Sequence, residues 1–560
     1  ATTTTIDEER EREREGGVER RESARIEPWG KQNTMSSLPS LPSTAPVSLA
    51  TSMDGHCVPG LIEGQEFESV QRSGLFGKLL SVDRESVTSM ARSMRSNATY
   101  RSAGYSISAS SYKDGSGKDR DVGVAPPQQA SWVAIAFIMI SEVVGAGVLT
   151  LSQKYAELGW IIPSIAIIAI FFLVVYTSSM MVEVRKVFPG IVCLSDGADY
   201  TYGKWARIAV QTFVILYLVC TLGDYLLLVG KSLGSTAYNV HLCYPIWSLI
   251  GAAVLVPIVQ LRYLNATTFL CAMNMVSIIV VIALVIAGLA TKGRAADVET
   301  PLIAEGLDFM QFMQSLSAIF FTFGGQFMFY ELMSEMKDFT EFTKTFRIAG
   351  PFQVSIYLLV GCVGYYYKGT EASGYFLDNL GFGPAYRVAS ALLCFHIIVG
   401  FVIVGNVLCR ILHIQFSPFR ANDLSWRGRL EWAAVGFGVT ATSFVIANAI
   451  PFFDLLTGLI GGLLLPPLCL LAPVVLYIKT RHMVERPLAI WEWVINLSLV
   501  AFGVMLMVIS TMENVRELIS NWSTFGAPFS CHCQGMWDTC ECSKARLEYS
   551  GGFNCSSIAQ

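Results

Sequence analysis

Charged residues are scarce in this chain of 560 residues. Asp, Glu, Lys and Arg make up only 15% of it, whereas an ordinary soluble domain contains about 25%. Hydrophobic residues make up 52%, and the mean hydropathy is +0.48. These values exclude an ordinary soluble domain and indicate several membrane spans. The small formal net charge of -4 argues against a nucleic-acid partner, so the expected partner is the lipid bilayer.

Some signatures of enzymes are also missing. The chain has no HExxH pattern of a zinc hydrolase and no glycine-rich phosphate-binding loop. We therefore expect a protein that is not an enzyme, with no catalytic residues, no resident metal and no cofactor.

The first 130 residues differ in composition from the rest. They begin with the charge run DEEREREREGGVERRES and then become rich in Ser, Arg, Gly and Pro. Such a segment buries too little apolar surface to offset the entropy lost on ordering, so residues 1–130 are predicted to be disordered. Serines near arginines in SVDRESVTSMARSMRS make this arm a candidate site for a regulatory kinase or a trafficking partner. We expect no cleavable signal peptide before the first apolar run.

Apolar segments long enough to span a bilayer, about 20 residues each, fill the chain from residue 131 onward. They begin near Ser131, Leu158, Trp205, Pro245, Phe269, Phe312, Gly350, Tyr386, Glu431, Phe452 and Ile490. The sequence thus predicts an all-α polytopic membrane protein with about 11 transmembrane helices. Residues 131–510 would form the membrane domain and residues 511–560 a cysteine-rich tail.

Loop charge predicts the orientation. If the N-terminus is cytoplasmic, most loop lysines and arginines, from Arg185 to Arg486, fall on the cytoplasmic side. With an odd number of spans, the C-terminal tail is then extracellular or lumenal.

The tail carries five cysteines and two glycosylation sequons. The cysteines are Cys531, Cys533, Cys540, Cys542 and Cys555. On an oxidising outer face they favour disulfides over a zinc site built with His532. Five cysteines leave one over, for which Cys243 in an outer loop is a candidate partner. The sequons make Asn521 and Asn554 glycosylation candidates.

The first span is interrupted in mid-membrane by glycine, in SEVVGAGVLTLSQKYAELGW. In lipid, a helix gives up backbone hydrogen bonds only where the freed groups line a cavity or find other partners. Freed amides at Gly145-Ala146-Gly147 would attract a carboxylate, and freed carbonyls an ammonium group or a cation. The alternative is close helix packing by small residues. Gly324-Gly325 interrupts span six similarly, as two inverted repeats would require.

Four ionisable residues lie at membrane depth, where each costs at least about 2 to 3 kcal/mol. They are Glu142, Asp224, Glu331 and His396. His396 is either a proton carrier or a neutral, hydrogen-bonded bundle residue. Glu331 is either a gate or a packing partner for a loop arginine such as Arg347.

The other two residues also have alternative roles. Glu142 could carry a proton, bind a substrate's ammonium group or face a watery vestibule. Asp224 could face the pocket and favour cationic substrates, or pair with Lys231 near the headgroups.

Four stretches together resemble the amino acid/auxin permease family, within the APC superfamily. They are ISEVVGAGVLTLSQKYAELGW, FTFGGQFMFYELMSEMKDFTEF, FHIIVGFVIVGNVL and IPFFDLLTGLIGGLLLPPL. They lie in order and at family spacing, and the resemblance covers about residues 131–510. It implies an amino acid transporter transmembrane domain with LeuT-like inverted five-helix repeats and broken helices one and six. It also implies symport of amino acids driven by a cation gradient.

The resemblance further implies a substrate site at the two breaks. The residues carried over are Gly145, Ala146, Gly147, Val148, Phe323, Gly324, Gly325 and Gln326. His396 matches a histidine common in plant-type members and Glu331 an acidic position of the family, whereas Glu142 departs from the usual small or neutral residue.

The coupling ion and the substrate are less directly indicated by the sequence. Sodium-driven relatives of this fold often use Ser or Thr in span eight, and the segment after His396, IIVGFVIVGNVLC, has no hydroxyl. The absence of hydroxyls favours protons as the coupling ion. Asn406 is a candidate replacement ligand, so sodium remains an alternative. Phenylalanines near the second break, including Phe323 and Phe327, suit neutral side chains or face lipid, and auxin-like indole acids remain an alternative.

The leading hypothesis is a proton-coupled amino acid symporter of the plasma membrane or a vacuolar or lysosomal membrane. A second hypothesis is a nutrient-sensing receptor with the same fold that signals through the N-terminal arm. Removing residues 1–130 discriminates between the transporter and the receptor hypotheses. Amino acid uptake should persist in a transporter whose arm only regulates it, and an uptake assay on the truncated protein measures this.

Overall fold

The computed structural model describes most of the chain from residue 130 onward. The described residues are 110–113, 119–122, 130–237, 240, 242–260, 267–381, 383–417, 420, 425–450, 453–525 and 528–529. All of them belong to one compact unit, Gly74–Gln560. The tail cysteines from Cys531 to Cys555 and the sequon residue Asn554 lie outside the described residues.

A short hairpin precedes the helices. Strand β1 (Ser110–Lys113) pairs antiparallel with β2 (Asp119–Val122), with Ser110 opposite Val122. It lies in the segment for which the composition predicted disorder, and the other residues before Ala130 lie outside the described residues.

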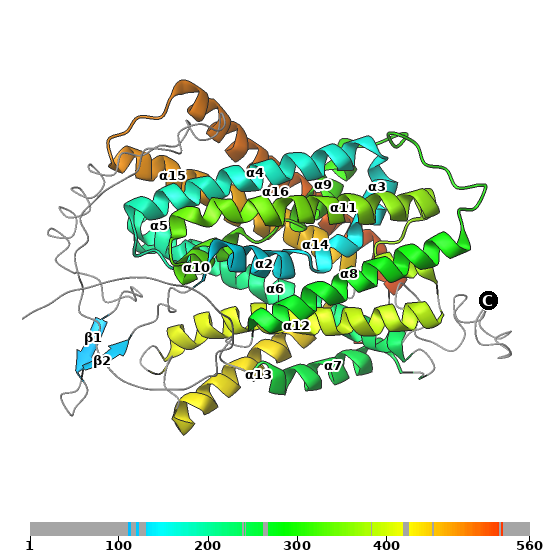
Figure 1. The fold of residues 1–560 in the computed structure, drawn as a ribbon, viewed down its shortest axis with the longest axis horizontal. Helices are drawn as coiled ribbons and strands as arrows, with labels where there is room; N and C mark the ends of the chain where they lie inside the picture. The colour runs from blue at the N-terminus through cyan, green and yellow to red at the C-terminus, as the bar shows by residue number, and fades with distance from the viewer. Residues whose placement is uncertain are drawn as a thin grey trace, which may run out of the picture. The chain divides into compact units, whose positions relative to one another are not determined.

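The remaining elements are helical (Figure 1). In chain order they are α2 (Trp132–Val143), η1 (Ala146–Thr150), α3 (Leu151–Leu158), α4 (Ile161–Val187), α5 (Leu194–Tyr202), α6 (Lys204–Thr236), α7 (Tyr244–Ile258), α8 (Thr267–Lys292), α9 (Phe309–Phe321), η3 (Gln326–Met328), α10 (Phe329–Glu335), η4 (Phe339–Thr345), α11 (Phe346–Lys368), η5 (Gly369–Glu371), η6 (Phe376–Leu380), α12 (Pro384–Phe416), α13 (Trp426–Ala449), α14 (Phe453–Leu459), η8 (Ile460–Leu464), η9 (Pro467–Leu471), α15 (Ala472–Met483) and α16 (Ile490–Phe525).

Within the described part of the chain, eight helices are long and apolar enough to cross a membrane. A ninth span results if the pair Trp132–Ser141 and Ala146–Leu158, bent by 47°, is counted as one. The two other predicted spans correspond to α7, an apolar helix of 15 residues, and to α9 with α10, which a break divides. The structure is thus a multi-span helical membrane protein, and the count of eleven spans stays a prediction.

The long helices α6 and α12 pack against each other at the centre of the bundle. Helix α12 also packs on α8 and α13, and α7 lies against α6 and α13, whereas α15 and α11 pack on α4. Outward-facing side chains on the peripheral helices are apolar, such as Phe172 on α4, Phe437 on α13 and Leu497 on α16, which are 56%, 61% and 56% exposed. A surface of this kind suits lipid rather than water.

Glycines allow some helix pairs to approach closely. A Cβ atom on Gly361 of α11 would overlap the ring of Tyr155 on α3, and one on Gly350 would overlap the ring of Phe171 on α4. Both rings lie against the glycine backbone, so these contacts fix the distance between the helices.

We predict that Gly361→Ala destabilises the protein by roughly 1 to 3 kcal/mol, because the added methyl group has to displace the buried Tyr155 ring. Thermal melting in detergent measures the effect. The matched control is Gly438→Ala in α13, where nothing lies within 4 Å of the added Cβ, so its melting temperature should stay the same or rise. Equal melting temperatures for Gly361→Ala and the wild type would contradict the prediction.

Candidate functional site

The first predicted span breaks after α2. The N–H of Val144 donates to the Ile140 carbonyl at 3.1 Å and closes α2, and the chain resumes as the tight turn η1 from Ala146. Helix hydrogen bonding is lost between them, so the backbone groups near Gly145 need other partners or a polar cavity.

The second break follows α9, and two tyrosines from other helices satisfy its backbone. The hydroxyl of Tyr357 on α11 donates to the Thr322 carbonyl at 2.5 Å. The hydroxyl of Tyr217 on α6 donates to the Gly324 carbonyl at 3.2 Å. These two hydrogen bonds replace backbone hydrogen bonds that the interrupted helix lacks. They stabilise the non-helical conformation of the second break.

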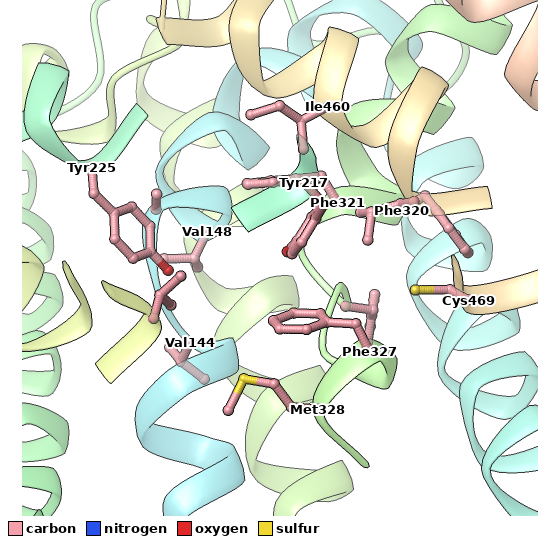
Figure 2. Close-up of a cluster of buried hydrophobic side chains, with 14 of the residues drawn as sticks. Val144, Val148, Tyr217, Tyr225, Phe320, Phe321, Phe327, Met328, Ile460 and Cys469 are labelled. Atoms are coloured by element: carbon pink, nitrogen blue, oxygen red, sulfur yellow. The ribbon is translucent and has the colours of Figure 1, made fainter. Parts of the chain in front are cut away.

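The two breaks are in direct contact. A Cβ atom on Gly147 would lie 3.0 Å from the Thr322 Cα atom and 3.0 Å from the Phe321 Cδ1 atom. Only glycine fits at this position without displacing the second break. Figure 2 shows Val144 and Val148 of the first break beside Phe321 and Phe327 of the second.

A small cavity lies between the breaks. Its lining comes from both breaks, from α6 and from α12: Gly145, Ala146, Gly147, Tyr217, Thr221, Tyr225, Phe321, Thr322, Gly324, Phe327 and Val404. Its volume of about 20 Å³ has room for about one water molecule. The cavity is therefore too small for any larger solute as it stands in this structure.

The lining combines backbone polarity with aromatic walls. Tyr217 and Phe327 pack with ring centroids 4.7 Å apart, while the Thr221 hydroxyl is buried with no hydrogen-bond partner among the described residues. A few convergent polar groups in an apolar, aromatic cavity are typical of a site for a small amphipathic solute.

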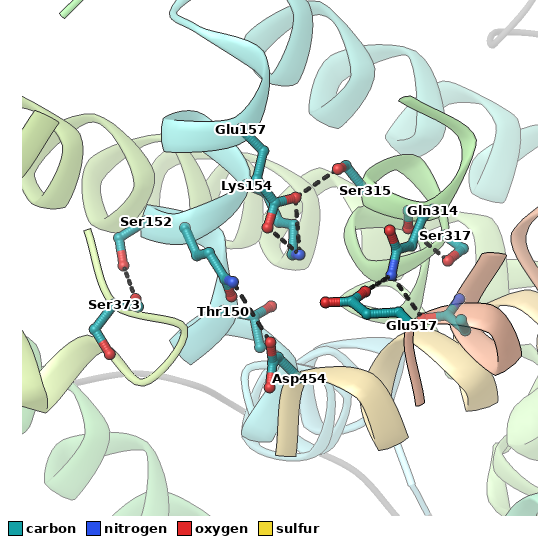
Figure 3. Close-up of polar contacts among 12 residues, drawn as sticks. Thr150, Ser152, Lys154, Glu157, Gln314, Ser315, Ser317, Ser373, Asp454 and Glu517 are labelled. Atoms are coloured by element: carbon teal, nitrogen blue, oxygen red, sulfur yellow. Dashed lines mark hydrogen bonds and ion pairs between the residues drawn. The ribbon is translucent and has the colours of Figure 1, made fainter. Parts of the chain in front are cut away.

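Polar contacts join α3 to the neighbouring helices. Lys154 pairs with Glu157 at 2.7 Å, and Glu157 accepts a hydrogen bond from Ser315 at 2.5 Å. Gln153 donates to Asp454 of α14 at 3.4 Å. Figure 3 shows that these contacts join α3 to α9 and α14.

Backbone hydrogen bonds close the side of α2 and α10. The N–H of Ala130, just before α2, donates to the Glu335 carbonyl at 2.9 Å, and the N–H of Lys337 donates to the Ala130 carbonyl at 3.0 Å. These bonds tie the start of the first broken helix to the end of the second.

Residues 128–515 match the family described as "Transmembrane amino acid transporter protein". The chain belongs to this family. It is therefore a multi-pass membrane transporter of amino acids and not an enzyme, as the sequence predicted.

Several similar proteins are named as amino acid transporters or permeases. The transporter is 22% identical over 428 residues to the "N amino acid transport system protein" of Neurospora crassa, an alignment that covers 73% of this chain and 90% of that protein. It is 24% identical over 424 residues to "Amino acid transporter AVT3C" of Arabidopsis thaliana, with 71% and 93% covered. It is 24% identical over 442 residues to "Amino acid permease 3" of the same plant, with 66% and 86% covered.

The predicted substrate residues of the transporter separate into two groups. Gly145, Ala146, Gly147 and Gly324 line the cavity. The others are buried but do not line it: Val148, Asp224, Phe323, Gly325 and Gln326. Among the latter, the Phe323 ring packs edge-on against Tyr357, and the side-chain oxygen of Gln326 accepts from the Gly325 N–H.

Asp224 lies on α6 one turn beyond Thr221. It is fully buried, and neither carboxylate oxygen has a hydrogen-bond partner among the described residues. Its proposed partner Lys231 pairs with Asp378 instead, at 2.6 Å. The headgroup pairing of Asp224 with Lys231 is therefore wrong, because Asp378 from η6 reaches the lysine.

Glu331 lies in α10, where the sequence suggested Arg347 as a partner. The arginine that interacts electrostatically with it is Arg185 of α4, whose guanidinium donates to the Tyr330 carbonyl at 2.8 Å. Glu331 therefore faces the junction of α4 and α10, close to the end of the second broken helix.

His396 is buried in α12 and contacts the neighbourhood of the first break. Its Nδ1 atom lies 3.1 Å from the Asn274 carbonyl oxygen of α8, and its ring also interacts with the backbone of Val144. The side chain of Glu142 lies outside the described residues.

The remaining predicted positions concern covalent modification. Cys243 is disulfide-bonded; its partner lies outside the described residues, so the pairing with a tail cysteine stays a prediction. The other described cysteines are free: Cys193, Cys220, Cys271, Cys362, Cys394, Cys409 and Cys469. Asn521 falls in the last turns of α16, and its side chain is outside the described residues.

One enzyme-like string has a plain structural explanation. Residues 230–234, GKSLG, match the GxSxG pattern of hydrolases. That pattern acts at a sharp turn between a strand and a helix, whereas this string lies inside the continuous helix α6. The buried Ser232 hydroxyl shares a hydrogen bond with Tyr375 at 3.3 Å, so it is a packing contact.

Sequence reasoning missed the contribution of α6 to the cavity. Tyr217, Thr221 and Tyr225 recur every four residues and therefore lie on one face of the helix. A polar and aromatic stripe on an otherwise apolar span was a usable signal. Val404 of α12 had no such signal, because valine is common on every face of a membrane helix.

We predict that Gly147→Ala lowers amino acid uptake at least about tenfold, because the added methyl group has to displace Phe321 and Thr322 of the second break, and small misplacements at a binding site are costly. Uptake into proteoliposomes, normalised to the amount of protein, measures it. The control is Gly405→Ala in α12, where the nearest atoms lie 3.8 Å from the added Cβ. Uptake by Gly147→Ala within about twofold of the control would contradict the direct contact of the breaks as a requirement for transport.

Proposed function

We propose that this transporter is a proton-coupled amino acid symporter whose substrate binds between the two helix breaks. The observation that supports it best is the cavity shared by Gly145, Gly147 and Gly324, where backbone groups released from two helices meet. Family membership supplies the class of substrate.

The substrate's charged ends fit the polarity of the first break. Its carboxylate is placed at the amides that begin η1 and α3, because helix N-termini attract anions. Its ammonium group is placed at the carbonyls that end α2 and α9, since helix C-termini attract cations. The side chain then lies among Tyr217, Tyr225 and Phe327, which favours neutral and apolar amino acids.

Two closures support transport by alternating access. The polar contacts around Lys154 and Glu157 act as the gate on one side of the cavity, and the backbone bridge of Ala130 to Glu335 acts on the other. Either gate opens while the other stays closed, and the substrate reaches one side of the membrane at a time. In this conformation both are closed around the small cavity.

The proton is assigned to His396. Because a carbonyl oxygen only accepts, the Nδ1–H group of the imidazole donates to the Asn274 carbonyl, and Nε2 is the atom that takes and releases the proton. The ring also interacts with Val144, the residue before Gly145. Proton binding is thereby linked to the position of the first break.

The wider architecture is proposed on the same basis. Helix breaks in the first and sixth predicted spans support two inverted five-helix repeats and one added helix. The distribution of loop charge supports a cytoplasmic N-terminus and an extracellular or lumenal tail. The membrane is that of the cell surface or of a vacuolar or lysosomal compartment.

We predict that an imposed pH gradient drives accumulation of neutral amino acids in proteoliposomes, and that an imposed sodium gradient does not. His396→Gln should abolish the proton-driven part, because an amide does not exchange protons in this pH range. The matched control is His482→Gln at the exposed end of α15, which should accumulate amino acids like the wild type.

Two outcomes would contradict this proposal. Accumulation driven by an imposed sodium gradient would show that the coupling ion is sodium and not a proton. If neither gradient drives accumulation while an amino acid still stabilises the protein against heat, the nutrient-receptor hypothesis accounts for the result better.

A further inference from the structure

The Ser141 carbonyl near the end of α2 is capped by a side chain from another helix. The Nδ2 atom of Asn274 on α8 lies 3.2 Å from the Ser141 carbonyl oxygen and 3.2 Å from the Ser141 Oγ atom. In an unbroken helix the Ser141 carbonyl would accept from the N–H of Gly145. The amide of Asn274 therefore supplies the hydrogen bond that the break removes.

The same residue contacts the histidine of the proposed coupling site. The main-chain carbonyl of Asn274 accepts from the Nδ1–H of His396 at 3.1 Å. It also accepts from the Ser277 hydroxyl one turn later, at 2.8 Å. Asn274 thus binds the first broken helix through its side chain and the histidine through its backbone.

All members of this arrangement are removed from water. Asn274 is 0% exposed, and Ser141 and His396 are each 2% exposed. The Oδ1 atom of Asn274 has no hydrogen-bond partner among the described residues. A buried amide oxygen without a partner is costly, so the hydrogen bonds that the Nδ2 group makes have to offset that cost.

We propose that Asn274 is a positioning residue that transmits the protonation state of His396 to the first helix break. This inference rests on the proton coupling proposed above. When Nε2 of His396 gains or loses a proton, the imidazole moves relative to the backbone of α8 and Val144. The amide of Asn274 carries this movement to Ser141, and so to Gly145 at the cavity.

Few charged or titratable groups lie near Asn274 and His396 in the described part of the chain. His396 of α12 is the titratable group in contact with Asn274, and no described charged side chain interacts with that histidine. Asp378 of η6, which also packs on α8, is paired with Lys231. Glu142 of α2 is close in sequence to Ser141, and its side chain lies outside the described residues.

The experiment compares coupled and uncoupled transport in Asn274 variants of the full chain. Proteoliposomes report both accumulation driven by a pH gradient and exchange of labelled for unlabelled amino acid without a gradient. Asn274→Leu keeps the branched shape in a larger side chain and removes the amide, so accumulation should fall about tenfold while exchange changes less than about twofold.

A second variant adds a pH signature. In Asn274→Asp, a protonated carboxyl can donate to the Ser141 carbonyl and an ionised one cannot. The ratio of its accumulation to that of the wild type should rise as the pH falls, whereas the ratio for Asn274→Leu should stay flat.

Asn448 of α13 provides a matched control. It is 2% exposed, its Nδ2 atom donates to the Ser248 hydroxyl of α7 at 3.1 Å, and its Oδ1 atom is also without a partner among the described residues. Its side-chain hydrogen bonds among the described residues go to Ser248 of α7 and to the Phe444 carbonyl of its own helix, and to neither α2 nor His396. Asn448→Leu should lower thermal stability as much as Asn274→Leu does, without changing the ratio of accumulation to exchange.

The outcomes separate this inference from the proposed function. Wild-type accumulation that ignores the pH gradient would overturn the proton coupling, and this inference with it. Proton-driven accumulation that persists in Asn274→Leu would overturn only the role of Asn274. Equal losses of accumulation and exchange in both leucine variants would also overturn it, since they would show a structural role alone.

Discussion

A backbone polar group inside a bilayer has to find its partner within the protein, and this constraint underlies the arrangement of the whole bundle. Two helices are interrupted at the centre, and each interruption releases amides and carbonyls that lipid cannot satisfy. Tyr217 and Tyr357 satisfy the second break from α6 and α11, and Asn274 satisfies the first from α8. These hydrogen bonds constrain the positions of α6, α8 and α11 relative to the two breaks.

The breaks also place polar backbone groups at the centre of the protein. An unbroken apolar helix has no free backbone group in mid-membrane, whereas the ends of a broken helix can attract a charged group. His396 lies against the backbone of Val144 at the first break, and Gly147 of that break lies against Thr322 of the second. The two breaks are in direct contact, because a glycine leaves no side chain between them.

Much of the membrane domain was predictable from residue type alone. The apolar segments, the breaks at Gly145-Ala146-Gly147 and Gly324-Gly325, and the family resemblance all follow from local composition and short motifs. Four of the predicted substrate residues line the cavity, all of them at the breaks themselves. One prediction that differed concerned a partner: Lys231 pairs with Asp378 and not with Asp224.

The sequence by itself determined which segments enter the membrane and where two of them break, because hydropathy and glycine act through the nearest few residues. Only the tertiary structure decided which side chains complete the cavity and satisfy the breaks. Tyr217 and Gly324 are 107 residues apart and Asn274 and Ser141 are 133 apart. Contacts at such separations depend on how the helices pack, and an apolar helix gives little local indication of which face meets which neighbour.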